Sequence, residues 1–139
     1  MYKSVIIPVD LSHSERIQPM VSAARVLAAE DAEILLLNVI EDIPAYVRSQ
    51  VPQSIRDERD DEVRNQLKKI ARDNGLSENI MVRTGHAPSE ILAAAKQKNA
   101  DLIVIASHKP GFGDFLLGST AARVVRHSAC TVHVVRETG

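Results

Sequence analysis

Five short apolar runs alternate with helix-like stretches, and this alternation restricts the possible folds more than any other feature of the sequence. The runs span Val5–Val9, Ile34–Ile40, Ile80–Arg83, Leu102–Ala106 and Thr131–Val135. Nearly unbroken apolar runs of this length are typical of strands buried on both faces of a parallel sheet. Apolar residues between the runs recur at helical spacing. The order β-α-β-α-β-α-β-α-β predicts an α/β fold, with a doubly wound, five-stranded parallel sheet and helices on both faces.

Local signals place several ends of the predicted helices. Ser12 and Glu15 have the spacing of a capping box, which predicts a first helix with Ser12 as its N-cap. A long helix over residues 55–74 should end at Gly75, because glycine readily caps a helix C-terminus. The connector Glu41–Gln53 contains two prolines and is the longest stretch without a regular pattern.

Composition and charge narrow the class of protein. The 139 residues suit a single domain spanning 1–139, and 45% of them are apolar. A net charge of −1 disfavours nucleic acid as the main partner, and aromatic residues that could stack on bases make up only 3%. We find no targeting signal or long apolar segment, and the lone Cys130 cannot form an internal disulfide. We therefore expect a cytoplasmic protein that does not engage a membrane. The scattered histidines lack metal-ligand spacing, so no metal site is expected.

Polar residues follow two strands that we expect to be neighbours in the sheet. In doubly wound sheets, ligands bind outside the carboxyl ends of the strands, where the strand order reverses. Gly118 opens a helix, and the unpaired N–H groups and dipole at a helix start attract phosphates. The sequence thus predicts a phosphate site where two loops meet, one with Pro8, Val9 and Asp10 and the other with Ser107, His108 and Lys109.

Two residues of these loops admit more than one interpretation. The carboxylate of Asp10 could accept a hydrogen bond from a ribose hydroxyl, or it could cap the helix that follows. Its expected place at the switch point favours the ligand role. His108 could donate to a phosphate or merely line a loop. We predict no catalytic residue, because no triad geometry and no general base can be argued from the sequence.

The last apolar run, Thr131–Val135, would form an edge of the sheet. An apolar edge strand pairs with another chain unless something covers it. The simplest cover is the same strand of a second copy, antiparallel across a two-fold axis. We therefore expect a homodimer, or a tetramer built from it, in which Val132 and Val134 supply apolar contacts.

Four motifs together resemble one known family. They are VIIPVDLSHSE, LLLNVIED, GHAPSEIL and the final run IVIASHKPGFGDFLLGSTAARVVRHSACTVHVVR. With them the chain resembles the universal stress protein family over its whole length, and within it the F-type, ATP-binding subgroup, which shares the ASH-basic-Pro…LLGS pattern. The resemblance implies a three-layer sandwich of the adenine nucleotide alpha hydrolase-like, or flavodoxin-like, kind. It also implies a homodimer or higher oligomer, and bound ATP or AMP with or without Mg²⁺.

The same resemblance assigns nucleotide-binding roles residue by residue. The adenosine would lie against Pro8, Val9 and Asp10, with the adenine touching Val39 and the base or ribose flanked by Ile105 and Ala106. The phosphates would follow a loop of Ser107, His108 and Lys109 and be held by the amides and hydroxyls of Gly118, Ser119 and Thr120.

The chain departs from the family's phosphate-binding pattern at two glycines. Ala106 and Lys109 stand where the family has glycine, and the spacing to Gly118 is one residue shorter. A lysine there could replace amide contacts with a charge. The leading hypothesis is a stress-response protein that binds ATP or AMP and acts as a regulatory dimer. The alternatives are a nucleotide-free dimeric interaction module, and slow ATP hydrolysis or autophosphorylation with Ser119 or Thr120 as acceptor.

Overall fold

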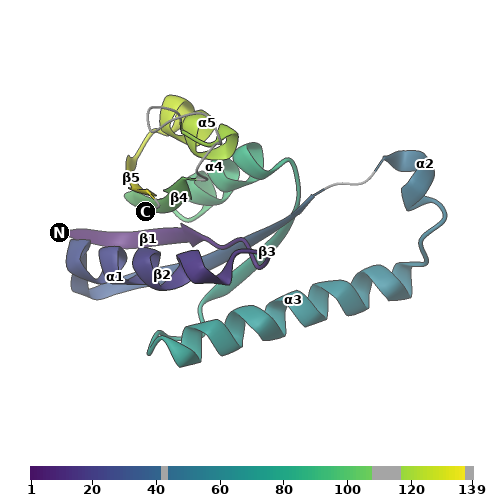
Figure 1. Ribbon diagram of the computed structural model, residues 1–139, viewed down its shortest axis with the longest axis horizontal. Coiled ribbons are helices and arrows are strands. Elements are labelled where there is room, and N and C mark those ends of the chain that lie inside the picture. Colours follow the sequence, from purple (N-terminus) through teal and green to yellow (C-terminus); the bar gives the residue numbers. More distant parts are fainter. Residues whose placement is uncertain (42–43, 108–116, 137–139) are drawn as a thin grey trace.

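A computed structural model describes residues 1–41, 44–107 and 117–136 of the chain. At its centre is a five-stranded sheet, paired in parallel, with the strand order β3-β2-β1-β4-β5 (Figure 1). The strands are β1 (Tyr2–Pro8), β2 (Ala28–Glu41), β3 (Ile80–Gly85), β4 (Leu102–Ser107) and β5 (Thr131–Arg136). The predicted α/β class and doubly wound sheet are confirmed, and the strand order reverses between β1 and β4.

Helices cover both faces of this sheet. The helices of the described residues are η1 (Ser14–Arg16), α1 (Ile17–Leu27), α2 (Ala45–Arg48), α3 (Gln53–Asp73), α4 (Ala87–Gln97) and α5 (Ser119–His127). α1 and α3 lie on one face of the sheet, and α4 and α5 lie on the other (Figure 1). Their buried side chains form one core cluster on each face. Among the helices of the described ranges, none is long and apolar enough to cross a lipid bilayer.

The central strand β1 shows why its apolar run is unbroken. Val5 and Ile7 point toward α1 and α3, whereas Ile6 points toward α4 and α5. All three side chains are at most 1% exposed. Both faces of the strand lie under helices, so a polar side chain at any of these positions would lose its water. The prediction of a strand buried on both faces is confirmed here.

The start of β2 differs from the prediction. The strand begins at Ala28 rather than at Ile34, and its first six residues are three alanines and three acidic residues. Tyr2 of β1 pairs with Ala28, and a register shift separates this pair from the regular ladder that begins at Ser4. Backbone hydrogen bonding to the neighbouring strand therefore extends β2 over residues whose side chains carry no strand pattern.

The capping-box prediction is wrong, and the prediction for Gly75 is confirmed. Ser12 Oγ donates to Asp10 Oδ1 at 2.6 Å, while η1 has His13 as its N-cap and no side-chain capping bond. Gly75 has a φ of 68° after α3. The N–H of Leu76 donates to the carbonyl of Ala71 at 2.8 Å, which is the closing bond of a Schellman motif.

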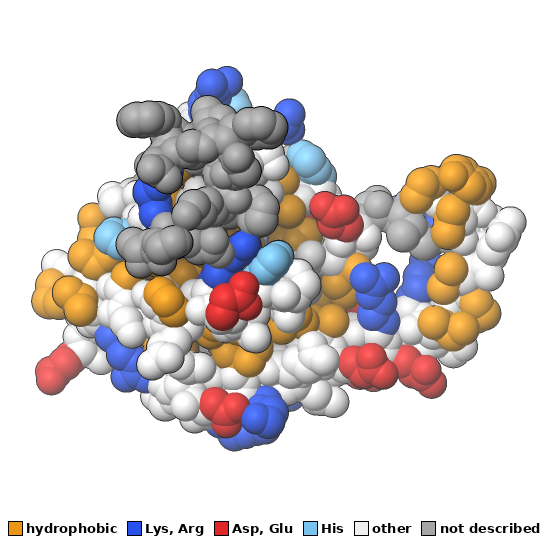
Figure 2. All heavy atoms as spheres, in the orientation of Figure 1, with side chains coloured by type: hydrophobic (Ala, Val, Ile, Leu, Met, Phe, Trp, Pro, Cys, Tyr) orange, Lys and Arg blue, Asp and Glu red, His pale blue; other side chains and the backbone are white. Residues whose placement is uncertain are grey.

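The connector between β2 and α3 contains the short helix α2, which projects from the body together with the first half of α3 (Figure 1). Tyr46 on α2 is 73% exposed and Ile55 on α3 is 54% exposed. Figure 2 shows hydrophobic side chains gathered over α2. The buried residues of α3, Leu67 and Ala71, lie in its second half. Only that half therefore anchors the helix to the sheet.

Stability should depend on the ionisation of Asp101. Its carboxylate accepts hydrogen bonds from the N–H groups of Lys3 and Ser4, each at 2.9 Å, and so ties β1 to the start of β4. The bond from Lys3, and then that from Ser4, holds the pKa of Asp101 below its ordinary value. A carboxyl group whose pKa is lowered by folding stabilises the fold above its unfolded pKa and loses this contribution as the pH falls through its folded pKa.

We therefore expect Asp101→Asn to reduce the loss of stability that the protein shows as the pH falls. Thermal unfolding of wild type and variant would be compared at about pH 6 and about pH 3, on either side of an ordinary aspartate pKa. The wild type should be the more stable protein at the higher pH, and the gap should narrow at the lower pH. A gap that is the same at both values would contradict this role.

Candidate ligand-binding site

A cavity of about 470 Å³ lies at the carboxyl ends of the strands, where the strand order reverses. Parallel strands bring their carboxyl ends to one edge of the sheet, so loops that are distant in sequence meet there. Most of the site residues expected from the sequence line this cavity: Pro8, Val9, Asp10, Val39, Ile105, Ala106, Gly118, Ser119 and Thr120.

Three other expected site residues are placed differently. Ser107 does not line the cavity. Its Oγ accepts a hydrogen bond from the N–H of Gly118 at 3.2 Å, and it thereby ties the end of β4 to the start of α5. His108 and Lys109 lie outside the described residues. Ser107 is therefore a positioning residue, because it holds one wall of the cavity without forming its surface.

The N-terminus of α5 forms the polar wall of the cavity. The first helical bond runs from the N–H of Ala122 to the carbonyl of Gly118 at 2.9 Å, and no side chain of the described residues caps the helix. The N–H groups of Ser119, Thr120 and Ala121 precede that bond and have no acceptor within the helix. All three residues line the cavity. Together with the helix dipole they make this wall positive and suited to an anion.

Asp10 does not cap the following helix among the described residues, since η1 has His13 as its N-cap and no side-chain capping bond. Its Oδ1 accepts hydrogen bonds from the Ser12 N–H at 3.0 Å and from Ser12 Oγ at 2.6 Å, which closes the turn before η1. Partial burial acts to raise the pKa of Asp10, but the bonds from Ser12 and the nearby His13 and Arg16 outweigh it, so the pKa lies below its ordinary value. The carboxylate therefore remains charged while it lines the cavity, and it can accept a hydrogen bond there.

Asn38 was missed by the sequence analysis. It is buried near the end of β2, where its Nδ2 donates to the carbonyl of Val9 at 2.8 Å. The N–H of Val9 in turn donates to the carbonyl of Leu37 at 2.7 Å. These bonds hold the loop after β1 against β2 beyond the end of the regular ladder. The one signal in the sequence is a single amide inside an apolar run, a position where a polar group needs a partner.

The inner wall of the cavity is apolar. Leu37, Ile91 and Ile105 are each at most 4% exposed, and they contact the cavity from β2, α4 and β4. Ionisable side chains from outside the set expected from the sequence also line the wall: His13, Arg16 and Glu41. Neither the helical spacing of Ile91 nor the loop position of Arg16 indicates a shared cavity, because only the fold brings their elements together. The site suits a ligand with one flat apolar part and one anionic part.

The fold and the cavity define a doubly wound α/β protein with its ligand site at the switch point of the sheet. Residues 1–136 match the sequence profile of the universal stress protein family, and the chain belongs to this family. One curated relative is universal stress protein G of Shigella flexneri. It is 31% identical over 144 aligned residues, which cover 98% of this chain and 100% of the relative.

Solved structures share the fold along nearly the whole chain. The hypothetical protein MJ0577 matches with a TM-score of 0.80 and 24% identity, over 100% of this chain and 99% of that one. A universal stress protein in complex with cAMP matches with a TM-score of 0.70 and 18% identity, over 99% of each chain. The universal stress protein from Archaeoglobus fulgidus in complex with dAMP gives a TM-score of 0.63 and 18% identity, over 96% of this chain and 97% of that one.

Proposed function

We propose that this protein binds an adenine nucleotide, ATP or AMP, in the cavity between β1 and β4 and acts as a regulatory protein in the stress response. The observation that carries the proposal is the division of one cavity into an apolar wall and the positive N-terminus of α5. An adenine base suits the first and phosphates suit the second. Two proteins of this fold, one bound to cAMP and one to dAMP, add support.

Each wall of the cavity has a part in this proposal. Val39 and Ile105 contact the adenine through their aliphatic side chains, and Asp10 accepts a hydrogen bond from a ribose hydroxyl. Pro8 and Val9 provide the backbone edge of the adenosine pocket, with Ala106 opposite the ribose. The amides and hydroxyls of the α5 start hold the phosphates: Gly118, Ser119 and Thr120.

Calorimetry of the purified protein with ATP and with AMP tests this function. Each titration would be run with Mg²⁺ and with a chelator, since carboxylate and phosphate oxygens are the ligands that Mg²⁺ prefers. Saturable heat from either nucleotide supports the proposal, and no heat at millimolar concentration would end it. Native mass spectrometry of the gently purified protein supplies a second readout. Co-purified nucleotide argues against a nucleotide-free interaction module.

We also propose that β5 pairs with β5 of a second copy. β5 is an edge strand of the sheet, and Val132 and Val134 are half-buried against the α4 and α5 side. An apolar edge of this kind gains hydrogen bonds and apolar burial when it meets its own copy. Light scattering during gel filtration should give the mass of a dimer, or of a tetramer built from dimers. Val132→Thr with Val134→Thr should shift the mass toward the monomer, and a monomeric wild type would refute the pairing.

A further inference from the structure

Two basic residues line the cavity from the segment that follows β1. His13 caps η1 and Arg16 ends it. η1 leads directly into α1, which packs on the face of the sheet opposite α5. The cavity wall therefore combines the start of α5 with basic side chains of the η1 turn.

Hydrogen bonds within the turn hold the backbone of both residues in place. The N–H of His13 donates to the carbonyl of Asp10 at 3.0 Å, and the N–H of Arg16 donates to the carbonyl of His13 at 3.1 Å. The imidazole Nδ1 of His13 lies 3.2 Å from Glu15 Oε1, which orients the ring. Both His13 and Arg16 are half-buried, so their side chains lose less freedom on binding than fully exposed ones would.

The charges of the cavity wall indicate what His13 and Arg16 contribute to ligand binding. Within the described part of the chain, the acidic residues that line the cavity are Asp10 and Glu41, and the basic ones are His13 and Arg16. The two carboxylates repel a phosphate tail, and a helix N-terminus offers only about half an elementary charge. Every phosphate beyond the first adds negative charge near the cavity mouth. A longer tail therefore depends more strongly on the basic residues of η1.

We propose that Arg16, assisted by His13, determines specificity for the length of the phosphate tail, so that the protein binds ATP and ADP more tightly than AMP or cAMP. This inference rests on the proposed binding of adenine nucleotides. The planar guanidinium of Arg16 can donate two parallel hydrogen bonds to a phosphate, and His13 provides a further donor beside it. The other walls of the cavity bind the adenosine part of the ligand.

The wild-type protein provides the first test. Calorimetry with ATP, ADP, AMP, cAMP and adenosine in one buffer should show ATP bound at least about tenfold more tightly than AMP. Equal affinities for ATP and AMP would overturn the role of the η1 residues and would leave nucleotide binding intact. No binding of any of the five would overturn the proposed function, and this inference with it.

Substitution of Arg16 provides the second test. Arg16→Gln should weaken ATP binding by about tenfold, the loss expected for one charge-assisted contact. It should change adenosine binding by less than about twofold, because adenosine has no tail for the guanidinium to hold. Arg16→Lys should recover part of the ATP affinity through its point charge. An unchanged ATP affinity in Arg16→Gln, or equal losses for ATP and adenosine, would overturn the proposal.

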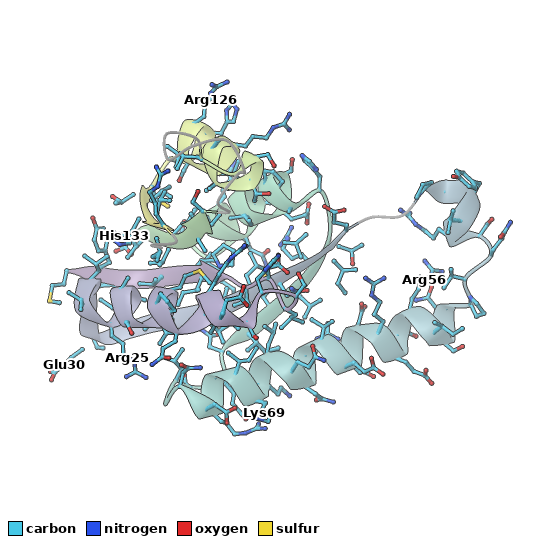
Figure 3. The ribbon with its side chains drawn as sticks, viewed as in Figure 1. Arg25, Glu30, Arg56, Lys69, Arg126 and His133 are labelled. Carbon is cyan, nitrogen blue, oxygen red and sulfur yellow. The ribbon has the colours of Figure 1, made fainter. Side chains whose placement is uncertain are left out.

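Two further variants serve as controls. One removes a positive charge outside the cavity, and the other tests the proposal without changing Arg16. Arg126→Gln removes an arginine from the exposed far end of α5, outside the cavity wall (Figure 3), and should leave every affinity unchanged. His13→Ala keeps Arg16 in place and should weaken ATP binding by about threefold, a smaller loss than that of Arg16 because a single donor is removed. It serves as the test variant if Arg16→Gln lowers the melting temperature. A wild-type preference for ATP that both substitutions preserve would also refute the assignment.

Discussion

Gly118→Asp is expected to weaken ATP binding by at least about a hundredfold, which corresponds to about 2.7 kcal/mol. Gly118 is the N-cap of α5 and lines the cavity beside Ser119 and Thr120. A carboxylate at this position would stand next to the phosphates of the proposed nucleotide. Two unit charges about 4 Å apart repel by about 4 kcal/mol in the intermediate dielectric near a protein surface. The measurement is a calorimetric titration of ATP into wild type and variant.

Gly118→Asn is the matched control for this substitution. Asparagine has nearly the shape of aspartate and is also a good N-cap, but it carries no charge. The φ of −59° and ψ of 154° at Gly118 suit both residues, so neither variant strains the backbone. The asparagine variant should therefore lose much less affinity than the aspartate variant. If the aspartate variant bound ATP as the wild type does, the phosphates would not lie at the start of α5.

Leu36→Ala is expected to lower the free energy of unfolding by about 3 kcal/mol. Leu36 has no exposed surface and lies in the middle of β2, in register with Ile7 of β1 and Ile80 of β3. It belongs to the cluster that joins the sheet to α1 and α3. Removing its side chain leaves a cavity between layers that cannot close without moving a helix. Urea unfolding followed by circular dichroism gives the change directly.

Val26→Ala is the control for the loss of apolar side-chain volume. Val26 lies on α1 and is 76% exposed. Its replacement removes little buried surface, and alanine has the higher helix propensity, so the free energy of unfolding should change by less than about 0.5 kcal/mol. A loss at Leu36 as small as the change at Val26 would show that the sheet is not the stabilising core.

The order of the elements could be predicted from side-chain patterns, because burial constrains each residue of a central strand. The run Val5–Val9 is apolar at every position, and the structure covers both of its faces with helices. The two misplaced boundaries lie where hydrogen bonding, and not the burial of apolar side chains, decides. Ala28 belongs to β2 because it pairs with Tyr2 of β1. The hydroxyl of Ser12 donates to Asp10 instead of capping a helix.

The candidate site was predictable in part. Asp10 and Gly118 stand beside recognisable ends of a strand and a helix, and both line the cavity. Asn38 and Arg16 were missed, because their roles depend on partners that are remote in the chain. The amide of Asn38 contributes to the site only because it donates a hydrogen bond to the carbonyl of Val9. Arg16 contributes to the cavity wall only because the fold brings η1 to the same edge of the sheet as the start of α5.

The sequence by itself determined the five strands, the longer helices between them and their order, since these follow from local periodicity and from the burial of apolar runs. It also placed an acidic residue after the first strand and a glycine at the start of the last helix. Only the tertiary structure decided which side chains share the cavity. Ser107 binds the backbone of Gly118, while His13 and Arg16 line the wall. Such contacts join residues far apart in the chain, and no local pattern records them.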